Sequence, residues 1–121
     1  MIGAYFLGNQ TIEVRPLHLG APGAGQVLLR VAACGVCGTD VHIYQGGKGS
    51  ADVTPPVILG HEFSGIVEQT GPGVSGLKPG QLVTVDPNIY CGTCPSCRQG
   101  QKQTCLHMKA VGVTMDGGFA D

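Results

Sequence analysis

The segment from residue 86 to residue 109 constrains this chain more than any other, because it combines four cysteines with many polar residues and almost no aliphatic run. Such a segment has too little apolar surface to stabilise a fold by burial. Short Cys-x2-Cys turns can direct two thiolates at one ion, and a longer spacer can return the chain for the fourth ligand of a tetrahedral zinc site. We therefore predict that residues 86–109 form a structural zinc lobe. Its ligands, spaced C-x2-C-x2-C-x7-C, are Cys91, Cys94, Cys97 and Cys105.

Two other interpretations of the four cysteines stay open. Cysteines can act as small buried apolar side chains, although a polar loop is an unusual place for four of them. Bacterial ferredoxins bind iron–sulfur clusters through C-x2-C-x2-C-x3-C-P, whereas here the last spacer is seven residues and Pro95 follows the second cysteine. Zinc is therefore the favoured metal. Pro95 and Gly100 are placed to begin and end a short helical turn that carries Cys97.

The six cysteines also bear on the compartment of the protein. Residues 1–7 lack a basic start and a long apolar stretch, so they do not resemble a signal peptide. No apolar run reaches the ~20 residues of a membrane span. We expect reduced thiols in the cytoplasm and no membrane partner. Seven basic and eight acidic residues without a basic cluster argue against nucleic acid as a partner.

Short strands separated by turn signals dominate the rest of the chain. Aliphatic and β-branched runs predict strands at residues 11–15, 26–33, 65–69 and 81–85, with a weaker one at 110–114. Pro- and Gly-containing turn sequences lie between them. Helical periodicity is limited to short turns after Thr39 and at residues 95–99. This pattern predicts one mostly β domain over residues 1–121, built as a small antiparallel barrel with short helices.

A second group of metal-ligand residues lies upstream of the lobe. Cys37 opens the sequence CGTDVH, and 24 residues later His61 is followed by Glu62. One thiolate, one imidazole and one carboxylate make three protein ligands, the number that catalytic zinc sites use so that one coordination position stays open. An open site lets zinc polarise a carbonyl or lower the pKa of a bound alcohol. Taken alone, Glu62 is better explained as a solvated carboxylate; the three residues together predict a catalytic zinc site.

Three neighbours of Cys37 suit supporting roles. Asp40 can accept the second ring N–H of His61 and so fix the tautomer of that ligand. Thr39 and His42 are three residues apart on an expected helical turn. A hydroxyl and an imidazole so placed could pass a proton from a zinc-bound alcohol to solvent. Taken alone, Thr39 is better explained as a helix cap and His42 as a surface histidine, so this relay depends on the metal site beside it.

The residues around His61 match a known signature. The sequence GHEFSG at residues 60–65 is followed by Gly71 and Val74. This resembles the pattern G-H-E-x2-G-x5-G-x2-V of the zinc-containing medium-chain alcohol dehydrogenases. The sequence that begins at Cys37 and the four-cysteine segment are similar to that family in content and order. The resemblance runs from about residue 26 to residue 121.

The resemblance implies a fold, an activity and a set of site residues. It implies a GroES-like β-barrel with an inserted four-cysteine lobe, and oxidation of an alcohol by hydride transfer to NAD or NADP. Cys37 and His61 would bind a catalytic zinc, and Glu62 would bind it directly or stand just behind it. Thr39 and His42 would form the proton relay. With a structural zinc in the lobe, each chain would hold up to two zinc ions, and the parent protein would be a homo-oligomer, either a dimer or a tetramer.

Gly38 bears on the substrate. Many alcohol dehydrogenases have an arginine at this point, which contacts the cofactor pyrophosphate. Glycine here is more similar to the sorbitol, butanediol and threonine dehydrogenase branches. The resemblance therefore implies a small polyol or other secondary alcohol, rather than ethanol, as the substrate.

A nicotinamide-binding motif is not recognisable in this chain. The sequence GPGVSG at residues 71–76 fits the dinucleotide-binding pattern G-x-G-x-x-G. However, Pro72 has no N–H to offer a phosphate, and residues 77–80 cannot begin a helix whose N-terminus would bind one. We interpret the motif as a turn between strands. With no Rossmann domain in the sequence, NAD or NADP is expected only in a longer parent protein, and the fragment alone is expected to be inactive.

Two further functions stay open. The chain could be a non-catalytic zinc-binding module that serves assembly or partner binding, or an iron–sulfur electron carrier. The pairing of Cys37 with His61 and Glu62 favours the enzyme, because a purely structural module has no use for an open three-ligand site.

Overall fold

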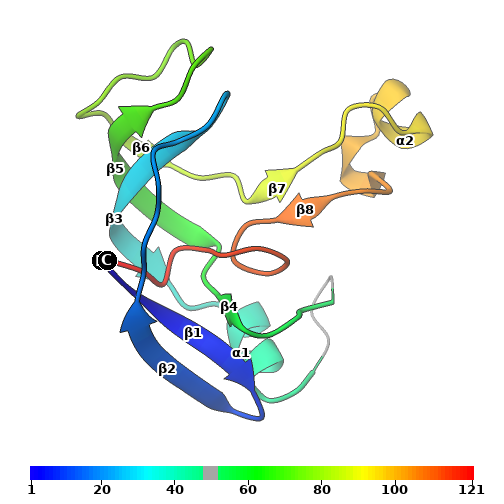
Figure 1. Cartoon of the computed structure of the whole chain (residues 1–121). Helices are drawn as coiled ribbons and strands as arrows, with labels where there is room; N and C mark the ends of the chain where they lie inside the picture. The colour runs from blue at the N-terminus through cyan, green and yellow to red at the C-terminus, as the bar shows by residue number, and fades with distance from the viewer. Residues whose placement is uncertain (48–51) are drawn as a thin grey trace.

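The computed structural model describes residues 1–47 and 52–121. Two three-stranded sheets make up its body, and a two-stranded arm leads to the segment with four cysteines (Figure 1). Within these described residues, no helix is long and apolar enough to span a membrane. The elements in chain order are β1 (Ile2–Gly8), β2 (Thr11–Pro16), β3 (Val27–Gly35), α1 (Gly38–Tyr44), β4 (Val57–Ile58), β5 (Glu62–Thr70), β6 (Leu82–Thr84), β7 (Asn88–Ile89), α2 (Pro95–Arg98), η1 (Lys102–Thr104) and β8 (Lys109–Ala110).

The sheets have the strand orders β2-β1-β4, β3-β5-β6 and β7-β8. Every paired strand is antiparallel to its neighbour. The tail of the chain joins the first sheet, since Ile2 and Asp121 exchange two backbone hydrogen bonds of 2.7 and 2.9 Å. The prediction of a mostly β, antiparallel fold with short helices is therefore confirmed.

Four of the five predicted strands are found, as β2, β3, β5 and β6, and both predicted helical turns are found, as α1 and α2. The strand predicted at residues 110–114 is wrong beyond its first residue. The carbonyl of Ala110 accepts the N–H groups of both Val113 and Thr114, which closes a turn. Gly112 has a φ of +78°, a left-handed conformation that no regular strand contains.

Strands β1, β4 and β7 were not predicted. β1 pairs with β2 across Asn9 and Gln10, whose φ angles of 50° and 53° define the tight turn that suits the twist of a hairpin. Neither residue is a glycine, so the usual hairpin signal is missing. β4 and β7 have only two residues each, too few to produce a recognisable period.

One small apolar cluster connects the first sheet, α1 and the tail. The buried members are Phe6 of β1, Ile43 of α1, Val57 of β4, Leu59 and Val113. Together they pack against α1, whose N-cap is Cys37, and against the segment that precedes His61. The core therefore lies directly behind the two segments that carry the candidate ligands.

The remainder of the chain is unusually exposed. The accessible surface is 7539 Å², whereas a compact monomer of 12.4 kDa exposes about 6,100 Å². Figure 1 shows β7, β8 and α2 extending away from the two sheets. Within residues 86–109, all of which are described, the buried residues are Cys94 and Cys97. This segment has no aliphatic core of its own.

Candidate metal centres

The four cysteines of residues 86–109 converge on one point. Their sulfur atoms all lie within 4.8 Å of one another. The Sγ atoms of Cys91 and Cys97 are 3.9 Å apart, and those of Cys94 and Cys105 are 4.0 Å apart. Two thiolates on one tetrahedral zinc with Zn–S of ~2.3 Å lie about 3.8 Å from each other. The donor set and its spacing therefore fit a zinc ion.

Local backbone structure explains the convergence. Cys94 caps α2, Pro95 occupies the first turn, and Gly100 follows the helix with a φ of +77°, as the sequence predicts. Backbone N–H groups point at the sulfur atoms, as in sites that stabilise thiolates. The N–H groups of Thr93 and Cys94 donate to Cys91 Sγ at 3.5 and 3.3 Å, that of Cys97 donates to Cys94 Sγ at 3.5 Å, and that of Cys91 donates to Cys105 Sγ at 3.3 Å.

The thiols do not have equivalent surroundings. The N–H groups of Thr93 and Cys94 lower the pKa of Cys91 to about 6, whereas burial raises the pKa of Cys97 to about 12. The fold alone therefore stabilises negative charge at one sulfur and opposes it at another. A divalent cation is what would hold all four as thiolates, because a coordinated thiol is deprotonated by the metal.

Cys37, His61 and Glu62 form a second cluster, with ligand atoms within 4.8 Å of one another. Cys37 Sγ lies 3.1 Å from His61 Nε2. Atoms that share one tetrahedral zinc, at ~2.3 Å for sulfur and ~2.0 Å for nitrogen, lie about 3.5 Å apart, so a small outward shift would admit the metal. The antiparallel pairing of β3 with β5 creates this cluster, because it sets Gly35 opposite Glu62. Cys37 follows the end of β3, and His61 precedes the start of β5.

Asp40 lies behind this cluster and is only 4% exposed. Its Oδ2 accepts the backbone N–H of Cys37 at 3.0 Å. Its Oδ1 lies 3.6 Å from His61 Nδ1, and both of these atoms are buried without a hydrogen-bond partner among the described residues. A shift of a few tenths of an ångström would form the bond between them. His61 would then carry its proton on Nδ1. The Nε2 lone pair, on the side of Cys37 Sγ, would be free to bind a metal.

Thr39 and His42 lie on α1, one helical turn apart. Thr39 is half-buried and His42 is exposed, with its ring packed against Gly47. Neither side chain hydrogen-bonds to the other among the described residues. Their function as a proton relay therefore stays a prediction.

An open cavity of about 560 Å³ lies beside the second cluster. His61 and Glu62 both line it, together with residues of β3, β5, β6 and the segment that follows β6: Ala33, Gly35, Phe63, Ser64, Thr84, Val85 and Pro87. The cluster is therefore accessible from one side and packed against Asp40 on the other. This arrangement suits a metal site that must admit a small molecule.

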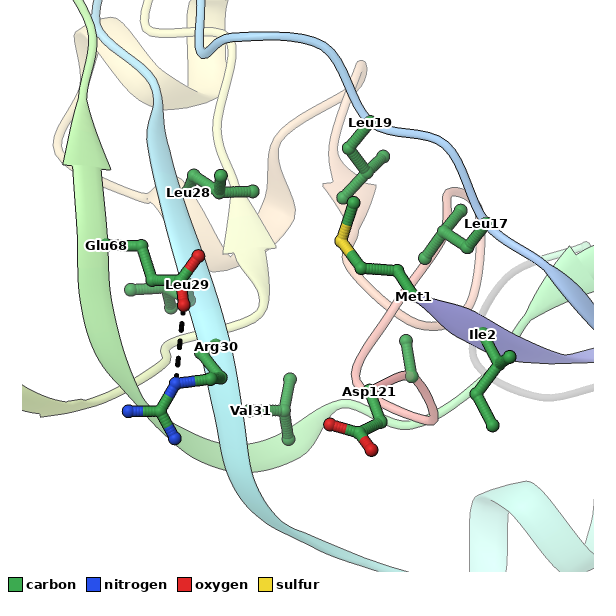
Figure 2. Close-up of a pocket in the computed structure, with 11 residues that line it drawn as sticks. Met1, Ile2, Leu17, Leu19, Leu28, Leu29, Arg30, Val31, Glu68 and Asp121 are labelled. Carbon is green, nitrogen blue, oxygen red and sulfur yellow. Dashed lines mark ion pairs between the residues drawn. The ribbon is translucent and has the colours of Figure 1, made fainter.

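A separate apolar cavity of about 480 Å³ lies between β3 and the N-terminal residues (Figure 2). Leu28 and Val31 lie on the side of β3 that faces Met1 and Leu19, Leu29 also lines the cavity, and an exposed Arg30–Glu68 ion pair of 3.3 Å lies at its edge. It contains no residue of either metal cluster, so it is not the candidate reaction site.

Close backbone packing explains why two positions of the GHE signature are glycine. A Cβ on Gly71 would collide with the carbonyl oxygen of Gly23, and one on Gly65 would lie 2.7 Å from the carbonyl oxygen of Arg30. Residues 71–76 form turns and bends between β5 and β6. The interpretation of GPGVSG as a turn rather than a dinucleotide-binding loop is therefore confirmed.

Two further residues adjoin the second cluster: Gly35, which sequence reasoning missed, and Cys34, which the sequence suggests only as a core residue. Gly35 leaves room for the Glu62 carboxylate, which would lie 3.6 Å from a Cβ at that position. Cys34 is half-buried in β3, and burial raises the pKa of its thiol. The pairing of β3 with β5 could have identified Gly35, but it spans residues far apart in the chain and leaves no local pattern.

Comparison with known proteins identifies the family. The family described as alcohol dehydrogenase GroES-like domain matches residues 23–121. L-threonine 3-dehydrogenase of Pyrococcus abyssi is 46% identical over 94% of this chain and 32% of its own length. A protein of Sinorhizobium meliloti 1021 assigned as a zinc-binding dehydrogenase, solved with NADP, has a TM-score of 0.89 and 43% identity over 98% of this chain and 34% of its own.

A thermostable alcohol dehydrogenase of Pyrobaculum aerophilum, solved with cobalt and zinc, has a TM-score of 0.84 and 35% identity over 99% of this chain and 37% of its own. The chain thus spans about a third of the length of these relatives. Both the sequence match and the close structural likeness cover nearly all of it. The chain therefore belongs to the medium-chain alcohol dehydrogenase family, whose GroES-like domain it carries.

Proposed function

We propose that this chain is the N-terminal catalytic-domain portion of a zinc-dependent, NAD(P)-linked dehydrogenase of a secondary alcohol or polyol. The observation that carries the proposal is the cluster of Cys37, His61 and Glu62, in which His61 and Glu62 line an open cavity and the buried Asp40 lies behind. In a structural zinc site four protein ligands fill the coordination of the ion. Three protein ligands beside a cavity leave one position open, as catalysis requires.

Each residue of the cluster has a distinct task in this proposal. Cys37 Sγ and His61 Nε2 hold the ion, and Glu62 binds it or stands next to it at the cavity mouth. Zinc, when bound, acts as a Lewis acid on the alcohol oxygen. Asp40 orients the His61 ring through Nδ1 and holds Cys37 through its backbone N–H. Thr39 and His42 then carry the alcohol proton from the buried side of α1 to its exposed end.

The substrate preference is supported by Gly38 and by the relatives. A Cβ on Gly38 would meet no atom within 4 Å, so packing does not require glycine there and the space beside Cys37 is open. The L-threonine 3-dehydrogenase of Pyrococcus abyssi is similar over nearly the whole chain. A small secondary alcohol or polyol is therefore the proposed substrate, with NAD or NADP as hydride acceptor in the longer parent protein.

We also propose that residues 86–109 form a structural zinc lobe within a partial GroES-like domain over residues 1–121. The sulfur spacings support the zinc, and the large exposed surface supports a longer, homo-oligomeric parent. Reduced thiols at both centres suit a cytoplasmic location.

Metal analysis and activity assays test these proposals separately. We expect two zinc ions per chain, and one in each of Cys37→Ser and Cys91→Ser. The longer parent should reduce NAD or NADP with secondary alcohols, whereas this chain alone should not. Iron in place of zinc, or one zinc that is lost only in Cys91→Ser, would contradict the catalytic centre and favour an electron carrier or a zinc-binding module.

A further inference from the structure

The segment that carries His61 into its cluster is hydrogen-bonded to residues far along the chain. Residues 116–119 run beside residues 58–60, where the C-terminal stretch passes β4 before it ends beside β1 (Figure 1). Four hydrogen bonds join the two stretches: Gly117 N to Ile58 O at 2.8 Å, Gly118 N to Gly60 O at 2.8 Å, Phe119 N to Leu59 O at 3.0 Å, and Ile58 N to Asp116 Oδ1 at 2.9 Å.

Steric contacts fix Gly60 from both sides. A Cβ on Gly112 or on Gly117 would collide with the Gly60 carbonyl oxygen. On the other side, a Cβ on Gly60 would lie 2.8 Å from Cys34 Sγ and 2.9 Å from the ring of Phe119. Gly60 is therefore closely packed against residues 112–119 and Cys34, and the next residue is His61.

We propose that residues 112–119, here called the brace, position His61 for metal binding. The inference rests on the proposed metal centre at Cys37, His61 and Glu62. The brace supplies no ligand and acts through the backbone of Gly60. A metal ligand must lie within a few tenths of an ångström of its bonding position. A displacement of Gly60 would move the adjacent His61 and so change the distance between His61 and the metal.

The lobe provides an internal control for this idea. Its sulfur atoms accept hydrogen bonds from backbone N–H groups of the lobe itself. The brace is therefore expected to affect metal binding at one centre and not at the other. Equal weakening of both centres would instead indicate a general effect on the fold.

Gly117→Ala tests the brace, because Gly117 does not have a left-handed φ, and a methyl group there would collide with the Gly60 carbonyl oxygen and with the backbone of Gly112, which is itself part of the brace. Gly20→Ala is the matched control, since a Cβ on Gly20 meets no atom within 4 Å. Each chain is titrated with Co²⁺, and the spectrum of the lobe alone is recorded in Cys37→Ser. We expect two cobalt ions in the wild type and in Gly20→Ala, and at least about tenfold weaker binding at the His61 centre in Gly117→Ala.

Asp116 offers a second test that introduces no collision. Asp116→Ala removes the acceptor for the Ile58 N–H, and we expect about tenfold weaker cobalt binding at the His61 centre with unchanged binding in the lobe. Asp116→Asn keeps an oxygen acceptor and should restore the affinity. Two wild-type-like sites in both Gly117→Ala and Asp116→Ala, or equal weakening of the lobe, would overturn the brace alone. A wild-type chain that binds cobalt only in the lobe would overturn the metal centre and the brace with it.

Discussion

His61 Nδ1 lies 3.6 Å from Asp40 Oδ1, and both atoms are buried without another hydrogen-bond partner among the described residues. Since the other carboxylate oxygen of Asp40 already accepts the N–H of Cys37, one side chain links two of the three proposed ligands. A neutral His61 that donates from Nδ1 has its Nε2 lone pair free for a metal.

Asp40→Asn should separate these two functions of the side chain. The amide oxygen can still accept the Cys37 N–H, so the cap of α1 is kept. The amide NH₂ would then face His61 Nδ1 and favour the tautomer with a proton on Nε2. We expect a loss of about 10- to 100-fold in metal affinity at this centre with little change in the unfolding midpoint. An Asn variant that binds metal as tightly as the wild type would show that Asp40 only caps the helix.

Removal of metal should unfold the lobe and leave the sheets intact. Within residues 86–109 the buried residues are two of the cysteines, so metal ligation replaces an apolar core there. Amide hydrogen exchange with and without a chelator should show lost protection in α2 and η1 and unchanged protection in β3 and β5. Equal protection of the lobe in both conditions would contradict this expectation.

The local motifs were predictable from sequence because their information is local. Cysteine spacing, Pro95 and Gly100 define the lobe within a few turns, and the aliphatic and β-branched run at residues 26–33 predicts a strand. The brace was not predictable, since Asp116 meets Ile58 across 58 residues of chain. The strand prediction at residues 110–114 is wrong because Gly112 has a left-handed φ, which ends the strand despite the β-branched residues around it.

The same limit applied to the candidate site. The three candidate ligands could be selected from the sequence because a thiolate, an imidazole and a carboxylate share one coordination chemistry, and the structure brings them together. Gly35 could not, since its relevance comes from the β3–β5 register that sets it opposite Glu62. The cavity that His61 and Glu62 line likewise depends on how residues of β6 and Pro87 pack against β5.

Cys34 should be the one thiol that stays free in the zinc-loaded chain. The other five cysteines are the proposed ligands of the two centres. Burial raises the pKa of Cys34, so less of it is the reactive thiolate near neutral pH. Mass spectrometry after iodoacetamide treatment at pH 7 should show at most one label, added more slowly than to a model peptide thiol. Six labels should appear after chelation in denaturant, and rapid labelling of several cysteines in the loaded protein would contradict the ligand assignment.

Phe6→Ala should weaken the His61 centre through the core rather than through the ligands. Phe6 is 5% exposed and packs behind α1, with its ring centroid 6.4 Å from that of Tyr44. A buried Phe→Ala change costs about 3–5 kcal/mol of unfolding free energy, whereas Leu82→Ala, at a residue 68% exposed, should stay within about 0.5 kcal/mol. Urea unfolding followed by circular dichroism measures both. Because α1 carries Asp40 and is capped by Cys37, cobalt binding at the His61 centre should weaken in Phe6→Ala while the lobe binds as before. Equal stability of the two variants would show that this cluster does not support the site.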